Sequence, residues 1–173
     1  MLTDGRFLAL IASFLEQLLP FFQWCYGTPL GETIRNSNWM FALIEASHLL
    51  GLGLTGGAVL LVDLRLLGVG LVKQPPAQLW AGVRPWLLGS VTLMFASGIP
   101  LFLSEAIKCL YSFPFWVKMT SLLLVLVFTF TVVRRATQGG PVSDRLLPDR
   151  ITALISLALW FTVAWGGRWI GFS

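Results

Sequence analysis

The chain has 173 residues, of which 56% are hydrophobic and 12% are charged, and its mean hydropathy is +0.79. A soluble domain carries about 25% charged residues, so this composition is typical of an integral membrane protein. The formal net charge is +4. Because the basic residues lie mostly between apolar segments, we interpret them as determinants of membrane topology, and we expect no nucleic acid partner.

Residues 3–24 form the first predicted element, an amphipathic helix. Apolar residues recur at helical spacing on one side, and polar residues fill the other side. The apolar positions are Phe7, Leu8, Ile11, Phe14, Leu15, Leu18 and Phe22. This pattern favours a helix that lies in the membrane interface and ends near residues 20–27, with a fifth span as the alternative. The acidic residues and the lack of a small-residue cleavage site argue against a secretory signal.

Four later segments are apolar over the length that a bilayer requires, about 20 residues at 1.5 Å per residue. They cover residues 38–61, 86–105, 115–133 and 151–169. Pro85 and Pro114 stand just before the second and third spans, and Pro100 should kink the second. We therefore predict an all-α integral membrane protein, a four-helix transmembrane bundle with an N-terminal interfacial helix, in a single membrane domain over residues 1–173.

The basic residues between the spans predict the orientation. Seven of them lie in the loops after the first and third spans: Arg65, Lys73, Arg84, Arg134, Arg135, Arg145 and Arg150. The opposite side carries five. By the positive-inside rule both termini lie outside, which in a bacterial inner membrane means the periplasm.

Asp63 and Arg65 end the first span on the inner side, in the stretch VDLRLLG. An acidic residue beside basic loops most often forms salt bridges. We expect this pair to form salt bridges with the neighbouring basic loops, with Arg84 or Arg134 as the partner of the Asp63 carboxylate.

The two cysteines, Cys25 and Cys109, have no CxxC or Cys/His spacing. A structural zinc or iron–sulfur site needs about four ligands and is excluded within one chain. Both cysteines fall near the predicted outer face, and we interpret them as two ordinary apolar thiols, with a disulfide as the alternative.

The candidate functional site is in the first span, where Glu45 and His48 stand one helical turn apart. His48 is the only histidine in the chain. An ionisable residue at membrane depth is costly, and it marks a functional site by default. Four glycines follow it in the same span: Gly51, Gly53, Gly56 and Gly57.

These residues suggest haem as a cofactor. Neutral imidazole is a common axial ligand of haem iron, and Gly51 and its neighbours would let a porphyrin approach the backbone. Lys118 at the start of the third span and Arg168 at the end of the fourth could pair with propionates. Two alternatives stay open: the glycines also form small-xxx-small packing patterns, and His48 could make a structural hydrogen bond or serve another metal or a proton.

Two stretches carry a resemblance: SHLLGLGLTGGAVLLVDLRLLG and the later FPFWVKMTSLLLVL. Across residues 40–135 the chain resembles the copper resistance protein D family and its uncharacterised four-helix relatives. It is similar in the same two places to the bacterial membrane protoporphyrinogen oxidase family. In that family a first-helix histidine and a lysine some seventy residues later are implicated in haem binding, and His48 and Lys118 match them in order and spacing.

The chain departs from the oxidase pattern in two respects: some forty residues precede the match, and the first span ends in DLRLLG. The resemblance therefore implies haem binding, and the oxidase activity is not carried over to this chain. We expect a b-type haem-binding or electron-transfer membrane subunit, with His48 as axial metal ligand and Lys118 as second ligand or propionate partner. Glu45 would orient the imidazole or exchange protons.

Two other functions stay open. One is a non-redox accessory or structural subunit of a larger membrane complex, and the other is a small metal or proton transport protein. In each case the expected partners are membrane lipid and other membrane subunits or further copies of the chain. The sequence favours a cofactor-binding or accessory subunit over a stand-alone enzyme.

Overall fold

The computed structural model describes residues 4–71, 73–138 and 146–170, and these residues form helices without any strand. In chain order the helices are α1 (Asp4–Tyr26), α2 (Pro29–Asn36), α3 (Met40–Leu67), α4 (Pro76–Ser104), α5 (Ala106–Tyr111), α6 (Phe113–Phe128), the π-helical turn η1 (Thr129–Val133), α7 (Arg134–Gln138) and α8 (Leu146–Ile170).

Four helical segments within the described ranges are long and apolar enough to cross a membrane: Met40–Leu67, Pro76–Ser104, Phe113–Gln138 and Leu147–Ile170. The third of these joins α6, η1 and α7 into one rod. The predicted all-α class and four candidate spans are therefore confirmed.

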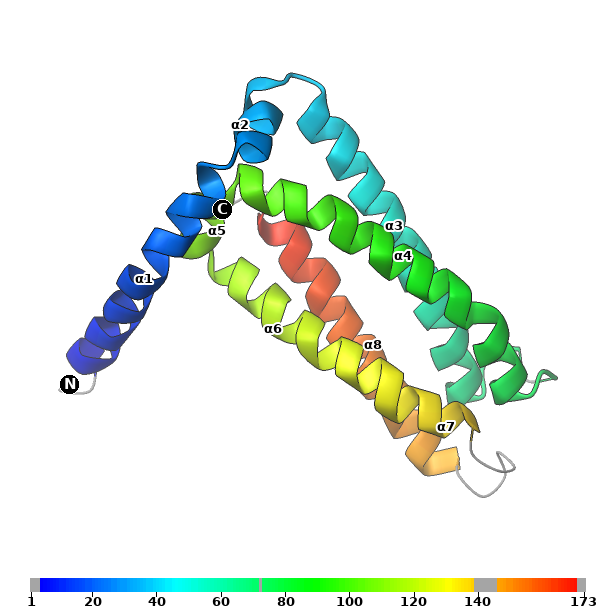
Figure 1. The fold of residues 1–173 in the computed structure, drawn as a ribbon. Helices are drawn as coiled ribbons and strands as arrows, with labels where there is room; N and C mark the ends of the chain where they lie inside the picture. The colour runs from blue at the N-terminus through cyan, green and yellow to red at the C-terminus, as the bar shows by residue number, and fades with distance from the viewer. Residues whose placement is uncertain (1–3, 72, 139–145, 171–173) are drawn as a thin grey trace.

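The spans form two pairs, α3 with α4 and α6 with α8, and α3 also contacts α8 (Figure 1). The two pairs converge at the end where α7 lies, and at the end that carries α2 and α5 Phe102 of α4 stacks on Phe115 of α6, with ring centroids 5.7 Å apart. One hydrophobic core joins all four spans, and Leu66, Leu87, Val133 and Val163 are almost fully buried in it. Hydrophobic packing therefore joins the spans at both ends of the bundle.

Two boundaries of the spans differ from the prediction. The second span begins at Pro76, so the placement of Pro85 just before it is wrong, because Pro85 lies inside α4. A proline there removes the N–H that would bond the carbonyl four residues earlier, at Ala81. Ala81 is exposed near the end of the helix, where its carbonyl can bond water. Pro114 also lies inside its helix, because α6 begins at Phe113, but it is in the first turn, where a missing N–H costs nothing.

The first span continues to Leu67, six residues beyond its predicted end. Gly68 stops it by adopting a left-handed conformation with φ 77°. In that conformation its backbone N–H reaches the carbonyls of Leu64 and Arg65, a common way to satisfy the last turn of a helix. Glycine adopts such a φ at little cost.

The predicted N-terminal helix is present as α1, and it continues through Pro20 to Tyr26. Within the described residues α1 is not among the segments apolar enough to span. Helix α1 projects away from the bundle, and the C-terminal part of α1 packs against α5 (Figure 1). Phe22 and Cys25 are its buried residues at this contact.

Helix α2 was missed by the sequence analysis, although its start carries a recognisable signal. Thr28 caps the helix by accepting a hydrogen bond from the Gly31 N–H at 3.3 Å, and Pro29 follows at the first helical position. Arg35 in the last turn donates to the carbonyls of Tyr26 at 2.8 Å and Ser104 at 3.3 Å. This one guanidinium therefore joins α1 and α2 to the C-terminal end of α4.

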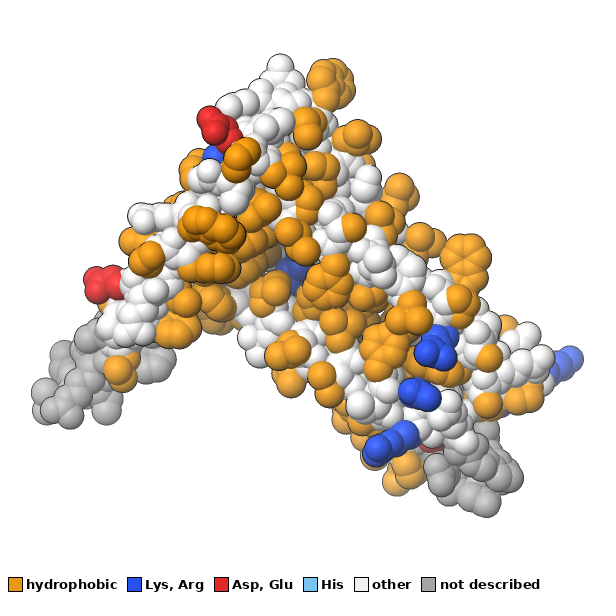
Figure 2. Space-filling view, in the orientation of Figure 1, with side chains coloured by type: hydrophobic (Ala, Val, Ile, Leu, Met, Phe, Trp, Pro, Cys, Tyr) orange, Lys and Arg blue, Asp and Glu red, His pale blue; other side chains and the backbone are white. Residues whose placement is uncertain are grey.

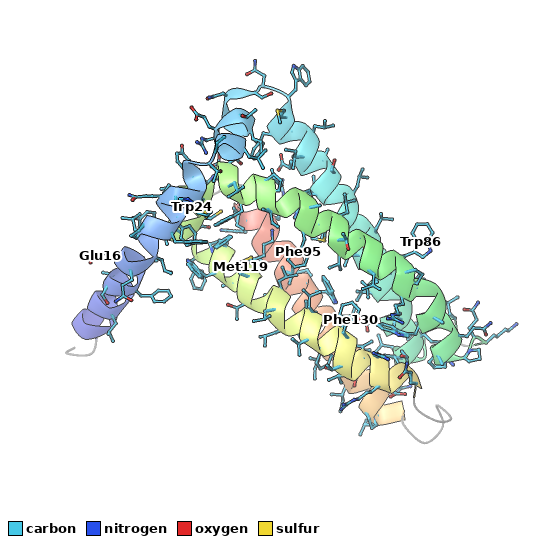
Figure 3. The ribbon with its side chains drawn as sticks, viewed as in Figure 1. Glu16, Trp24, Trp86, Phe95, Met119 and Phe130 are labelled. Carbon is cyan, nitrogen blue, oxygen red and sulfur yellow. The ribbon has the colours of Figure 1, made fainter. Side chains whose placement is uncertain are left out.

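The surface shows the pattern expected of a membrane protein. Apolar side chains cover the long helices, and the basic side chains seen on this face gather mainly near α7 (Figure 2). Trp24 and Trp86 are both 68% exposed and point away from the bundle (Figure 3). Large exposed apolar side chains on every span are costly in water and are at home in lipid.

Candidate functional site

The centre of the candidate site is the half-buried side chain of His48 on α3. Its Nδ1 lies 2.9 Å from Oγ of Ser97 on α4. Ser97 Oγ also lies 2.7 Å from the Leu93 carbonyl oxygen, to which its hydroxyl can donate. In the tautomer that carries its proton on Nδ1, the ring donates to Ser97 Oγ, and Nε2 keeps a lone pair for a ligand.

Gly98 on α4 leaves space for the imidazole ring of His48. A Cβ built on Gly98 would lie 3.1 Å from Cε1 of His48, which is tighter than ordinary van der Waals contact. Any larger residue at position 98 would push the ring away from its present place. Ser97 and Gly98 together fix the orientation and clearance of His48.

Lys118 lies on α6, with its side chain packed over two glycines of α8. A Cβ built on Gly166 would lie 3.2 Å from Lys118 Cβ, and one built on Gly167 would lie 3.6 Å from its Nζ. His48 packs against α4 and Lys118 packs against α8, and both residues lie in the half of the bundle that carries α2 and α5 (Figure 1).

The other predicted site residues lie elsewhere. Glu45 is on the exposed side of α3 and has no hydrogen bond or ion pair with the residues that the structure describes, so the ring is oriented by Ser97 and not by Glu45. Arg168 is exposed in the last turn of α8. Gly51 is buried where α3 crosses α4, and a Cβ there would lie 2.9 Å from Met94 Cγ. Helix packing therefore accounts for Gly51.

Phe95 on α4 and Met119 on α6 lie on the side of the bundle that Figure 3 shows. Their side chains are 44% and 41% exposed.

The prediction that Asp63 forms a salt bridge is wrong. Asp63 is fully buried, and neither of its carboxylate oxygens has a hydrogen-bond partner within the described ranges. Arg65 points elsewhere and donates from Nε to the Gln74 carbonyl at 2.7 Å. Two residues apart on a helix, the two side chains face different directions.

Cys25 and Cys109 are both buried and both free, which confirms the interpretation as apolar thiols. Burial raises the pKa of the Cys109 thiol to about 11 and also raises the pKa of Cys25. Neither thiol is placed for reaction. Among the described residues no three His, Cys, Asp or Glu side chains gather in a metal-binding group, so a metal at His48 would have one histidine from this chain.

Sequence reasoning missed Ser97 and Gly98. The available signal was a small polar residue followed by glycine within the second span. Only the antiparallel pairing of α3 and α4 shows that this pair reaches His48.

The comparisons with known proteins give one match. A family model described as a family of unknown function (DUF6644) matches residues 21–173. The matched segment contains His48, Ser97 and Lys118, together with all four candidate spans. No curated protein and no solved structure matches the chain. The chain therefore belongs to the family of unknown function DUF6644.

Proposed function

We propose that this chain is a b-type haem-binding membrane protein that transfers electrons, with Nε2 of His48 as an axial ligand. The observation that carries this proposal is the hydrogen bond between His48 Nδ1 and Ser97 Oγ. A metal-ligating histidine almost always donates its other ring N–H to a fixed acceptor, which sets the tautomer and the ring orientation. Haem bound here would supply one-electron redox chemistry.

The surrounding residues fit such a group. Gly98 keeps the edge of the imidazole clear, and Gly166 and Gly167 leave room for Lys118. Lys118 would serve as the second ligand or as the partner of a propionate, and Arg168, exposed at the end of α8, would pair with a propionate near the membrane surface.

We also infer that the chain lies in a bacterial inner membrane with both termini in the periplasm. An even number of candidate spans returns the chain to the side from which it started. The basic side chains that Figure 2 shows near α7 support a cytoplasmic position for that end. The end with α2 and α5, toward which His48 and Lys118 lie, would then face outward.

A second candidate function is an accessory subunit of a larger membrane complex, and α1 favours it. Helix α1 has large exposed apolar side chains: Phe14 is 52% exposed, Phe21 54% and Trp24 68%. Such a surface needs a cover of lipid or protein. A neighbouring membrane subunit or a second copy of this chain could supply it.

Haem content after purification tests the proposal. We would express the wild type, His48→Ala and Glu45→Gln in cells supplied with haem, and measure haem per folded chain. The proposal expects haem in stoichiometric amount in the wild type and in Glu45→Gln, whose altered residue is exposed on the same helix, and a loss in His48→Ala. A colourless, folded wild type would overturn the proposal and favour the accessory subunit.

A further inference from the structure

Asp63 and Ser156 are exceptions to the general pattern in which buried polar groups are hydrogen-bonded. They are 0% and 1% exposed, and the two Asp63 carboxylate oxygens and the Ser156 hydroxyl have no hydrogen-bond partner among the residues described. Elsewhere in the bundle the buried Ser90 and Thr55 hydroxyls are both bonded. Buried polar atoms without partners are few in native proteins, and each one asks for a physical explanation.

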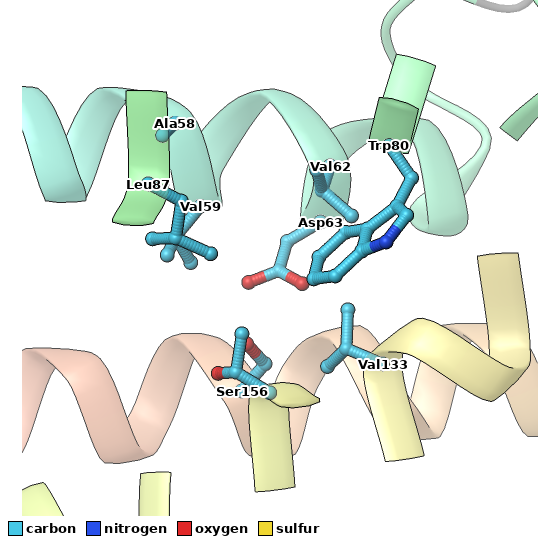
Figure 4. A pocket seen from close by; sticks show the side chains of 9 residues that line it. Ala58, Val59, Val62, Asp63, Trp80, Leu87, Val133 and Ser156 are labelled. Atoms are coloured by element: carbon cyan, nitrogen blue, oxygen red, sulfur yellow. The ribbon is translucent and has the colours of Figure 1, made fainter. Parts of the chain in front are cut away.

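The two side chains face one another across a small cavity where all four spans meet (Figure 4). Asp63 comes from α3, Trp80 from α4, Thr129 and Val133 from η1, and Ser156 from α8. About 10 Å³ of the cavity is open to the centre of a water molecule. One buried water needs roughly 10–15 Å³ on that measure and two to four polar partners. The cavity therefore suits one water and nothing larger.

Among the described residues that line the cavity, none other than Asp63 is charged. Toward it α4 presents Trp80, η1 presents Thr129 and Val133, and α8 presents Ser156. On its own helix Arg65 is engaged with the Gln74 carbonyl. An ionised carboxylate without a partner is very costly in an apolar interior, whereas a neutral carboxylic acid can donate one hydrogen bond and accept others.

We propose that Asp63 and Ser156 form an internal protonatable site, in which Asp63 holds a proton and one bound water connects its carboxyl to the Ser156 hydroxyl. The carboxylic acid donates its O–H to the water oxygen, and the water donates one of its hydrogens to Ser156 Oγ. When the site releases its proton, the Asp63 O–H bond breaks, the proton passes to the water, and the electron pair stays on the carboxylate.

The competing occupant is a monovalent cation such as Na⁺. Most of the cavity wall is apolar, and Asp63, Ser156 and Thr129 are its polar side chains. This set of oxygens is small for a metal cation but sufficient for one water. The site is also beside η1, and π-helical turns inside α-helices are frequent at functional sites.

The site is separate from the proposed haem region. Asp63 follows His48 by 15 residues on the same helix, about 22 Å along its axis. The inference therefore does not depend on haem, and it would stand if the wild type proved colourless.

Infrared spectroscopy of the purified protein tests the site directly. At roughly pH 8, about four units above the ordinary pKa of aspartate, exposed carboxyl groups are ionised and give no protonated C=O stretching band. The proposal expects such a band in the wild type, shifted to lower frequency when the aspartates carry carbon-13. The band should be lost in Asp63→Asn, and it should move to higher frequency in Ser156→Ala because the bridging water loses an acceptor.

Asp149→Asn is the matched control, since Asp149 is the other buried aspartate in the described part of the chain. The band should survive this change. Because the wild-type band and its isotope shift need no variant, a folding failure of Asp63→Asn would not leave the proposal without a test. Absence of the band in folded wild type, or a band that Na⁺ removes and choline does not, would overturn it.

Discussion

The imidazole of His48 on α3 and the hydroxyl of Ser97 on α4 are joined by a 2.9 Å hydrogen bond that crosses the helix pair. Because the Ser97 hydroxyl can donate to the Leu93 carbonyl, 2.7 Å away, its oxygen is able to accept from Nδ1. One serine in the second span thus holds the orientation of the only histidine in the chain.

Removing this hydroxyl should weaken cofactor binding without removing the ligand. We expect Ser97→Ala to lower haem affinity by about 10- to 100-fold, the usual effect of losing the partner that orients a metal-bound histidine. Ser97→Thr retains the hydroxyl and should restore most of the affinity. Titration of apoprotein with haem, followed by absorbance, measures both. Equal haem affinity in Ser97→Ala and in the wild type would show that Ser97 does not contribute to haem binding.

Gly98→Ala should disturb His48 sterically. The new methyl would lie 3.1 Å from Cε1 of the ring, so the imidazole has to move. Gly89→Ala is the matched control, because a Cβ on Gly89 of the same helix meets nothing within 4 Å. We expect Gly98→Ala to lose haem or shift its spectrum while Gly89→Ala keeps both. Unchanged spectra in both variants would show that an alanine side chain fits at position 98 without moving His48.

Gly31→Ala should destabilise the corner formed by α2 and α4. Its Cβ would lie 2.6 Å from the Leu103 carbonyl oxygen, and backbone cannot yield as a flexible side chain can. We expect a loss of about 1–3 kcal/mol, the usual cost of overpacking. Gly82→Ala, with nothing within 4 Å, should not destabilise the protein. Thermal unfolding in detergent compares them, and a Gly31→Ala variant as stable as Gly82→Ala would contradict the close packing.

The two thiols should react slowly in the folded protein. Burial raises the pKa of Cys109 to about 11, so at neutral pH almost none of it is the reactive thiolate. Since the ordinary thiol pKa is 9.0, an unfolded chain ionises first, and folding stability should fall as pH rises from about 9 toward 11. The rate of alkylation of the Cys25→Ala variant, in which Cys109 is the remaining thiol, measures the reactivity of Cys109. Rapid labelling without denaturant at neutral pH would be the contrary result.

Hydropathy was sufficient to predict the four spans, because each contains about 20 apolar residues whatever its neighbours are. It could not predict the helix ends that depend on backbone detail. Pro85 lies inside α4, where the carbonyl it leaves without a partner is at an exposed residue, and Gly68 stops α3 through a left-handed conformation. The first depends on whether water reaches one backbone carbonyl, and the second depends on the φ of one residue. Mean hydropathy over a span contains neither quantity.

The site was predictable only in part for a similar reason. A lone histidine in an apolar span attracts attention in the sequence itself, and so does a lysine at the start of a later span. Ser97 and Gly98 gain their meaning from the packing of α3 against α4, and the burial of Asp63 depends on α8, whose Ser156 is 93 residues away in the chain. Contacts of that kind follow from the register between helices, which no local pattern encodes.

The most direct test of the central claim is an absorption spectrum of the detergent-purified protein, oxidised and then reduced with dithionite, recorded beside His48→Ala. The account predicts a Soret band and a reduced α band of b type in the wild type, both lost in the variant. A folded wild type, produced with ample haem, that shows neither band would contradict it.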